Sequence, residues 1–292
     1  MYELNRVGER TYYVNSPTNI GVYVTGDNRA YLIDSGNDKD AGKKVRRLLD
    51  EQGWTLVGII NTHSHADHIG GNRYLQQQTG CKIFAPGVEA AFTNHPLLEP
   101  ATLYGGNPHK DLRHKFLMAQ ESAAVDISDG DFSKDLEVIR LDGHSMEMIG
   151  LKTPDKVVFL ADCVSSEATL EKYQISFLYD AASYLTTLDR VEALDASLFI
   201  PAHAAPTEDI KPLAALNRQK VLEIADTLQA MLKTPMSFDA LLQQVFTEFG
   251  LTMTMEQHAL VGSTVRSYLS WLKDQGRVRA ELAQNMLLWH AD

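Results

Sequence analysis

The sequence predicts a mixed α/β protein in which helices cover the faces of β-sheets. Short apolar or alternating runs bounded by turn residues are typical of strands. Three such runs open the chain, at residues 11–14, 20–25 and 30–34. Amphipathic helices expected at 38–52 and 72–79 then alternate with apolar strands expected at 56–62 and 81–85. This strand–helix–strand order indicates a layered α/β architecture.

The same signals return after a stretch from Gly87 to Gln120 that shows no clear period. Loops of this length are usually functional or disordered, so we treat the stretch as an insertion. Further strands are expected at 136–141, 146–151, 156–160 and 196–200. Helices are expected at 165–172, 181–194 and 207–231.

After Thr234-Pro235 the pattern changes to helices followed by a hairpin. One helix is expected at 238–249, one or two more within 255–274, and then a hairpin that turns near Gln284-Asn285. This order is the outline of a winged-helix unit. We therefore predict a large domain over residues 1–232 and a small winged-helix-like domain over residues 233–292.

Composition limits the classes of function. A chain of 292 residues with 44% hydrophobic content can bury a sizeable core. Its formal net charge of -11 repels phosphate backbones, so a nucleic-acid partner is disfavoured. The sequence shows neither a signal-peptide pattern nor an apolar run of about 18 residues, and it has two cysteines. We expect a cytoplasmic protein with reduced thiols and no membrane span.

Four potential metal ligands lie within six residues, namely His63, His65, Asp67 and His68. The expected strand 56–62 leads directly into this cluster. Ligands in layered α/β folds sit at strand ends, and imidazole is the commonest metal-binding side chain. A mixed set of histidine and aspartate suits zinc or iron. The cluster therefore predicts a metal site.

Three more residues follow expected strands in the same manner, namely His144, Asp162 and His203. Each alone would more often be structural. Because four strand ends carry histidine or aspartate, a shared site is the better interpretation. Cys163 directly follows Asp162, and successive side chains of a strand point to opposite faces. We therefore expect Cys163 to be a buried, inert thiol.

These motifs resemble the metallo-β-lactamase superfamily, especially its glyoxalase-II-like hydrolase branch. In the family's order they are Leu-Ile-Asp-Ser-Gly around Asp34, Thr-His-Ser-His-Ala-Asp-His at 62–68, Gly-His-Ser at 143–145, Ala-Asp at 161–162 and Pro-Ala-His at 201–203. The resemblance implies a four-layer αβ/βα sandwich that holds two divalent metal ions.

The resemblance also assigns roles to the matching residues. The first metal would be held by His63, His65 and His144, and the second by Asp67, His68 and His203. Asp162 would bridge the two ions, and Asp34 would lie behind the ligands and orient their loop. Zinc is the expected metal, with iron or manganese as alternatives. A hydroxide bridging the ions would attack a carbonyl or phosphoryl centre, and Asp67 would orient it.

Two short segments are candidates for substrate contacts. The insertion carries Tyr104, Arg113 and Lys115, and its basic part would capture an anionic carboxylate or phosphate, or would simply be a solvated helix face. Lys172 and Tyr173 lie in the region where glyoxalase-II enzymes hold glutathione. The family's glycine-rich loop is absent here, which puts glutathione recognition in doubt.

The leading hypothesis is a binuclear zinc hydrolase of a small ester, thioester, lactone or related molecule, with a possible homodimer. One alternative is an RNA or DNA phosphodiesterase of the lactamase-like endoribonuclease type. Five basic against six acidic residues from Met231 onward argue against it. A second alternative is an iron-dependent oxidoreductase of the same fold. A binding protein without catalysis is disfavoured because the ligand set is complete.

Overall fold

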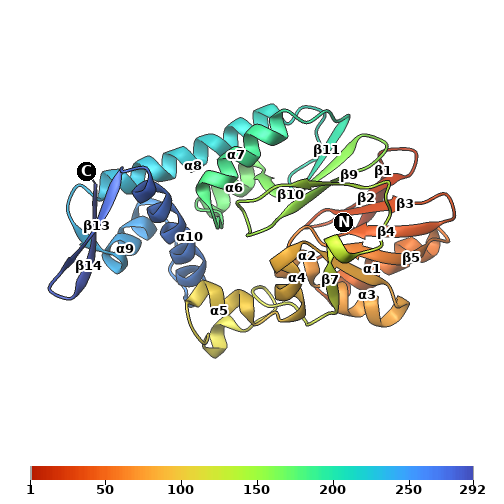
Figure 1. The fold of residues 1–292 in the computed structure, drawn as a ribbon, viewed down its shortest axis with the longest axis horizontal. Coiled ribbons are helices and arrows are strands. Elements are labelled where there is room, and N and C mark those ends of the chain that lie inside the picture. Colours follow the sequence, from red (N-terminus) through yellow and green to blue (C-terminus); the bar gives the residue numbers. More distant parts are fainter. Residues whose placement is uncertain (1, 292) are drawn as a thin grey trace.

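The computed structural model describes residues 2–291 and shows two β-sheets packed face to face, with helices on both outer faces (Figure 1). The larger sheet has the strand order β1-β2-β3-β4-β5-β6-β7 and the smaller one β11-β10-β9-β8. The strands of the larger sheet are β1 (Glu3–Arg6), β2 (Thr11–Asn15), β3 (Ile20–Val24), β4 (Arg29–Ile33), β5 (Thr55–Ile60), β6 (Lys82–Ala85) and β7 (Ala124–Asp126). Those of the smaller sheet are β8 (Glu137–Arg140), β9 (Ile149–Lys152), β10 (Val157–Ser165) and β11 (Leu198–His203).

Three hydrophobic clusters explain the layering. One cluster lies between the sheets and joins Tyr23 and Phe84 of the larger sheet to Leu151 and Phe159 of the smaller one. A second covers the outer face of the larger sheet with α1 (Lys39–Glu51) and α3 (Asn72–Thr79). The third covers the outer face of the smaller sheet with α7 (Ala181–Glu192) and α8 (Lys211–Met231). The predicted four-layer αβ/βα sandwich is therefore confirmed.

The insertion differs from the expected irregular loop. It contains α4 (Gly87–Asn94), α5 (Leu98–Tyr104) and the short 3-10 helix η1 (Lys110–Leu112). Helices this short are marginal by themselves and depend on tertiary contacts. Leu103 and Leu112 supply those contacts by packing on Ala259 of the C-terminal part. Local periodicity could not reveal helices that long-range packing stabilises.

Strand ends also differ from expectation. β10 continues past the expected end at residue 160 to Ser165, so Asp162 lies inside a strand and not beyond it. β9 begins at Ile149 and not at Met146. The sequence patterns do not predict five short elements, namely β1, β7, β12 (Met236–Ser237), α2 (Ala66–Ile69) and η2 (Ile127–Asp129). α6 (Glu167–Tyr173) agrees with the prediction within two residues.

The C-terminal part contains α9 (Phe238–Glu248), the single helix α10 (Met255–Asp274) and the hairpin β13 (Val278–Ala283) and β14 (Met286–Ala291). The hairpin turns at Gln284 and Asn285, both with positive φ, as a tight two-residue turn requires. β12 adds a third strand beside β14. The order of helices and hairpin is as expected, while the winged-helix assignment and the domain boundary at 232/233 stay predictions.

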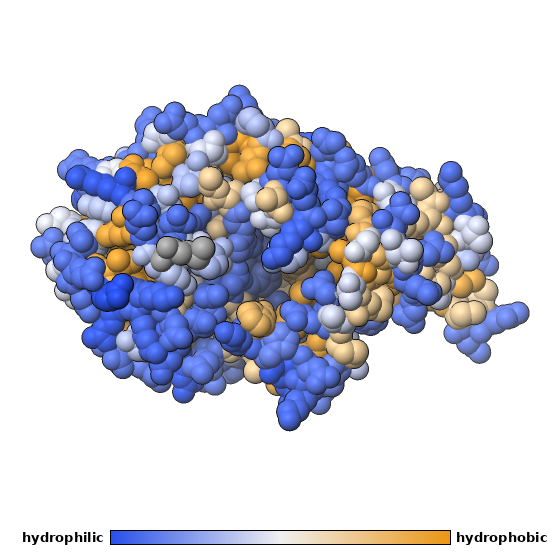
Figure 2. Space-filling model, turned by 180° about the vertical axis from the view of Figure 1, so that it is seen from behind, coloured by the Kyte–Doolittle hydropathy of each residue, from blue (hydrophilic) through white to orange (hydrophobic). Residues whose placement is uncertain are grey.

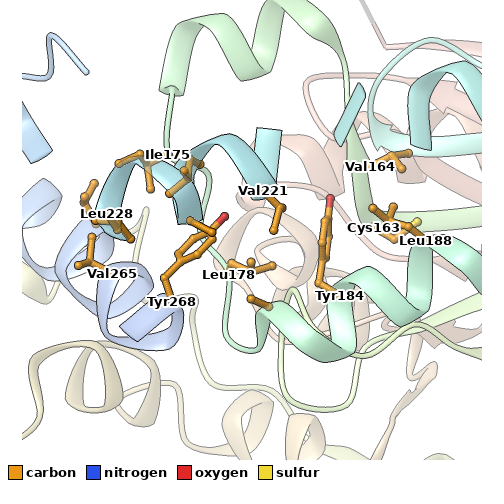
Figure 3. Packing of buried hydrophobic residues seen from close by; sticks show 14 of the residues in the cluster. Cys163, Val164, Ile175, Leu178, Tyr184, Leu188, Val221, Leu228, Val265 and Tyr268 are labelled. Atoms are coloured by element: carbon orange, nitrogen blue, oxygen red, sulfur yellow. The ribbon is translucent and has the colours of Figure 1, made fainter. Parts of the chain in front are cut away.

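The C-terminal part shares its core with the sandwich. Val265 and Tyr268 of α10 lie in the same buried cluster as Leu228 of α8 and Tyr184 of α7, as Figure 3 shows. Viewed from behind, the surface is mainly hydrophilic, with hydrophobic residues gathered over this part (Figure 2). Leu282, which lies close to the turn of the hairpin described above, is one of the exposed hydrophobic residues of this part. Among residues 2–291, no helix has the length and apolar character needed to cross a membrane.

Candidate metal centre

The ligand loop leaves the end of the buried strand β5 and turns into α2. Gly70 and Gly71 let this loop lie directly against the chain that follows β4. A Cβ atom added to Gly70 would lie 2.3 Å from the backbone carbon of Asn37, and one added to Gly71 would lie 2.4 Å from the carbonyl oxygen of Ser35. Larger residues would therefore push the ligand loop away from the sheet.

Asp34 fastens the ligand loop to the end of β4. Its carboxylate accepts hydrogen bonds from the backbone N–H of Thr62 at 2.8 Å and from the Thr62 hydroxyl at 2.7 Å. It also accepts from Nδ1 of His68 at 2.8 Å. Asp34 holds a φ of 64°, an uncommon value for a residue other than glycine, and it is 2% exposed. Asp34 thus combines a strained backbone with a buried carboxylate. Its carboxylate makes the contacts expected of a residue that orients the loop.

The first expected ligand set converges on one point. Nε2 of His63 and Nε2 of His144 each lie 3.0 Å from Nδ1 of His65. Ligands about 2.0–2.1 Å from one tetrahedral zinc ion lie about 3.3 Å apart. Both measured distances are close to this value, and all three ligand atoms lie within 4.8 Å of one another.

The second expected set converges beside the first. Nε2 of His203 lies 3.2 Å from Oδ2 of Asp67, and Nε2 of His68 lies 3.6 Å from the same oxygen. Asp162 lies between the two sets. Its Oδ1 is 2.9 Å from His68 Nε2, and its Oδ2 is 3.2 Å from His203 Nε2 and 3.5 Å from His144 Nε2.

Asp162 reaches both sets because its strand is irregular. The pairing of β10 with β11 shifts register on both sides of Ala161, which has a φ of 50°. Such β-bulges redirect a side chain, and they are common beside active sites. Cys163, the next residue, is fully buried in the hydrophobic cluster behind the sheet (Figure 3). Burial, followed by the charge of Asp162, raises the pKa of the Cys163 thiol, as an inert thiol requires.

Hydrogen bonds fix which nitrogen of three imidazoles is free to bind a metal. His68 Nδ1 must carry its proton because Asp34 can only accept, and His203 Nδ1 must do so because it faces the carbonyl oxygen of Pro17 at 3.2 Å. The Thr62 hydroxyl donates to Asp34, so it accepts from His63 Nδ1 at 3.1 Å. In each case Nε2 keeps a lone pair that points at the centre.

Two buried atoms at the centre have no hydrogen-bond partner, namely His68 Nε2 and Asp162 Oδ1. They lie 2.9 Å apart, and with His68 in the tautomer set by Asp34 both are acceptors. Two acceptors at this distance need a positive charge between them, which is either the proton that the raised pKa of His68 favours or a metal ion. This orphaned pair, with the seven converging donors, fits two divalent metal ions.

Electrostatics separates the two sets. Burial lowers the pKa of His65 and of His144 to about 4, so both imidazoles are neutral and able to bind a metal at neutral pH. Burial alone would lower the pKa of His68 too, but Asp162, Asp67 and Asp34 raise it well above its ordinary value. Burial alone would raise the pKa of Asp162, but His203 and His68 hold it well below its ordinary value. Positive charge is thus favoured at the carboxylate-rich set.

Two glutamates of the insertion contact the ligand loop, and the sequence did not single them out. Glu89 of α4 is 2% exposed and accepts hydrogen bonds from the backbone N–H of Ser64 at 3.0 Å and of Glu147 at 3.1 Å. Oε1 of Glu99, on α5, lies 3.5 Å from Nε2 of His65, the nitrogen opposite the metal-facing one. Burial, then Glu89 and Asp67, raise the pKa of Glu99 to about 8. Neither residue belongs to a local motif, so only the tertiary structure reveals them.

A cavity of about 610 Å³ opens beside His65. The ligand loop lines it with Ser64 and His65, the insertion with Phe92 and Glu99, and α10 with Arg266 among others. The arrangement thus places the candidate metal-binding cluster beside a cavity of the size that a small molecule occupies.

The predicted substrate contacts lie elsewhere. Arg113 and Lys115 line a separate cavity of about 910 Å³ between the insertion and α3. Tyr104 is 50% exposed and packs edge-on against His109. Lys172 donates a hydrogen bond to the hydroxyl of neighbouring Tyr173 at 3.0 Å. None of these five residues lines the described walls of the cavity beside His65.

Comparison with known proteins agrees with this geometry. The sequence profile described as the metallo-beta-lactamase superfamily matches residues 14–203, which include every expected metal ligand. A hydroxyacylglutathione hydrolase from Rhodopseudomonas palustris is 43% identical over 67 residues, which make up 20% of this chain and 26% of that protein. The match therefore spans about a quarter of that relative's length.

Two solved structures share the fold at low identity. A beta-lactamase domain protein from Burkholderia ambifaria has a TM-score of 0.74 and 18% identity, over 99% of this chain and 94% of that one. A metallo-beta-lactamase family protein from Thermus thermophilus has a TM-score of 0.71 and 16% identity, over 97% and 99%. With the profile match over most of the sandwich and the converging ligand set, the chain belongs to the metallo-beta-lactamase superfamily, within which it resembles the glyoxalase-II-like branch.

Proposed function

We propose that this protein is a binuclear, zinc-dependent hydrolase of small thioesters or related esters and lactones. The single observation that carries the proposal is the convergence of seven histidine and aspartate side chains, with Asp162 within 3.5 Å of His144 in one set and of His68 and His203 in the other. The local similarity to hydroxyacylglutathione hydrolases supports a thioester substrate. Nitrogen and carboxylate donors with tetrahedral spacing favour zinc, with iron or manganese as alternatives.

The proposed roles follow from the contacts. His63, His65 and His144 would hold one ion, and Asp67, His68 and His203 the other, with Asp162 between them. The bound ions would lower the pKa of a shared water and polarise the carbonyl that is attacked. The chain's own residues supply the geometry that makes this chemistry productive.

Asp67 is suited to orient the attacking water in addition to holding a metal. The Thr18 hydroxyl donates to its Oδ2 at 2.9 Å, which fixes the direction of the carboxylate. Its side chain is 40% exposed, whereas that of neighbouring His68 is fully buried. Asp67 therefore faces the solvent-accessible side of the centre, where water can reach it.

The proposed substrate is a small molecule and not a polynucleotide. The cavity beside His65 lies between the insertion and α10 and contains one arginine and no lysine among its described lining residues, and the chain carries a net charge of -11. A polyanion needs an open basic groove. Glutathione itself is not proposed, because Lys172 and Tyr173 contact each other and lie outside this cavity.

The test compares three chromogenic or thiol-releasing probes on metal-free and zinc-loaded protein. These are S-acetyl-N-acetylcysteamine, 4-nitrophenyl acetate and bis(4-nitrophenyl) phosphate. We expect hydrolysis of the thioester to disappear with chelation, to return with zinc, and to exceed hydrolysis of the phosphodiester. Thioester hydrolysis that is unaffected by removing the metal would contradict the proposal. So would a preference for the phosphodiester that weakens steeply with salt.

A further inference from the structure

The cavity beside His65 has two chemically different ends. One end is formed by Ser64, His65 and Glu99 at the metal centre. The other end is formed by one face of α10, and Leu103 of α5 contacts α10 where the insertion and the C-terminal part meet. Figure 1 shows α10 between α8 and α5. A helix far along the chain from every metal ligand therefore forms a wall of the substrate space.

The residues of α10 divide into two faces. The buried face packs against α7 and α8 and includes Val265 and Tyr268 (Figure 3). The cavity face carries residues spaced three, four, seven, eight and eleven positions apart, as one side of a helix requires. These residues are Ser263, Arg266, Ser267, Ser270, Trp271 and Asp274. The small serines leave room around the long side chain of Arg266.

The guanidinium of Arg266 is held in place without a counter-ion. Its carbon lies 3.8 Å from the centroid of the Phe238 ring, a stacked cation–π contact. Within residues 2–291, no hydrogen bond or ion pair engages it. Partial burial lowers the pKa of Arg266, and the charge of Asp239 on α9 only partly offsets this effect. Arg266 is exposed, and a flat guanidinium whose N–H groups have no partner among the described residues is suited to bind a carboxylate through two hydrogen bonds.

The other charged groups of the cavity do not neutralise Arg266. Glu89 is occupied by Ser64 and Glu147, and Asp180 caps α7 by accepting from Ala182 and Ser183. Glu99 lies at the metal end, against His65. Asp274 follows Arg266 by eight residues, about 12 Å along the helix axis. Among the lysines and arginines of residues 2–291, only Arg266 lines this cavity.

Four apolar side chains also line the cavity. They are Phe92, Leu103, Met146 and Phe177, and the Phe177 ring packs edge-on against His65. An apolar segment of a ligand would lose contact with water in this region and be stabilised by it. We propose that the substrate carries a carboxylate at the end remote from the scissile bond, that Arg266 binds this carboxylate, and that an apolar spacer joins the two. This inference rests on the proposed hydrolase function.

The test uses acetyl thioesters of three thiols with equal length and different terminal groups. The thiols are 6-mercaptohexanoate, 6-mercaptohexanamide and 6-aminohexanethiol. For the zinc-loaded wild type we expect kcat/KM to be roughly 10- to 100-fold higher for the carboxylate than for the amide, through a lower KM. In Arg266→Gln the carboxylate probe should fall to the level of the amide probe, and Arg266→Lys should retain part of the preference. Lys273→Gln, which removes an exposed cation of the same helix outside the cavity, should keep the full preference.

Two results would overturn the inference. The first is a wild type without preference for the carboxylate, or with preference for the ammonium probe. The second is an Arg266→Gln variant that loses activity on all three probes in equal proportion. If no probe is hydrolysed, the proposed function fails, and calorimetric binding of 6-(acetylthio)hexanoate still tests Arg266. Binding at least about tenfold weaker in Arg266→Gln than in Lys273→Gln supports the inference, whereas equal binding rejects it.

Discussion

The two sheets supply the proposed metal ligands in different ways. The larger sheet provides His63, His65, Asp67 and His68 from one loop after β5, held by Asp34. The smaller sheet provides His144, Asp162 and His203 from three separate places, one of them a bulge inside β10. Neither sheet holds a complete set, so the centre exists only when both sheets pack together. The comparison predicts that metal binding and assembly of the sandwich are coupled.

The largest effect is expected at Asp162, where the two contributions meet. Asp162→Ala removes the carboxylate that lies between both sets and that is within 3.2 Å of Nε2 of His68 and of His203. We expect occupancy to fall from two ions to one or none per chain and kcat to fall on the order of 1,000-fold. Elemental analysis and thioester hydrolysis measure these quantities. Full occupancy in this variant would remove the basis for a bridging role.

The next effects separate the two sets. His144→Ala should remove the ion that His63 and His65 hold, and His203→Ala should remove the ion that Asp67 and His68 hold. Each variant should therefore retain about one ion per chain, at different positions. Anomalous diffraction at the zinc edge would locate the remaining ion. Two unchanged peaks in either variant would show that the remote histidine is not a ligand.

A smaller effect is expected behind the ligand loop. Asp34→Asn keeps the size of the side chain but weakens the hydrogen bonds that this side chain accepts from Thr62 and His68. We expect metal affinity to fall roughly 10- to 100-fold, in line with other residues that orient metal ligands. Competition with a chromogenic chelator measures this affinity. Asp27→Asn on the exposed turn before β4 is the matched control, and an equal loss in both variants would contradict the role of Asp34.

The smallest effect is expected where the edges of the sheets are joined. Asp155, between β9 and β10, accepts hydrogen bonds from the backbone N–H of Arg10 at 3.0 Å and from the Thr11 hydroxyl at 2.6 Å. Burial alone would raise the pKa of Asp155, but the hydrogen bonds from Thr11 and Arg10 lower it. The ionised Asp155 therefore stabilises the fold at every pH above the ordinary pKa of an aspartate. This stabilisation is lost as the pH falls through the lower pKa that Asp155 has in the folded protein.

We expect Asp155→Asn to lower the free energy of unfolding by about 1 kcal/mol at pH 7. The difference from wild type should shrink as the pH falls below about 4. Urea unfolding of metal-free protein at both pH values measures this, with the exposed Asp111→Asn as control. A difference that stays constant with pH would show that the charge of Asp155 does not join the sheets.

Prediction from sequence succeeded for features encoded by neighbouring residues. The histidine cluster, the strands that lead to it and the hairpin turn at Gln284-Asn285 are all local patterns. The family motifs extended this to His144, Asp162 and His203, which the fold brings within hydrogen-bonding distance of the cluster.

The remainder depends on contacts between distant segments. α4 and α5 are too short to show a clear helical period, and Glu89 and Glu99 gain their importance only by packing against the ligand loop. Arg266 shows the same limitation, because nothing near it in the sequence relates it to the metal centre. Specificity residues of this kind are set by tertiary structure and not by a motif.

The most direct test of the central claim is the stoichiometry of zinc binding. Metal-free protein titrated with zinc in a calorimeter, with elemental analysis of the product, counts the ions that the two sheets hold together. Two ions per chain in wild type, with one in His144→Ala and one in His203→Ala, is the predicted result. A single ion per chain in wild type, or none, would contradict the account.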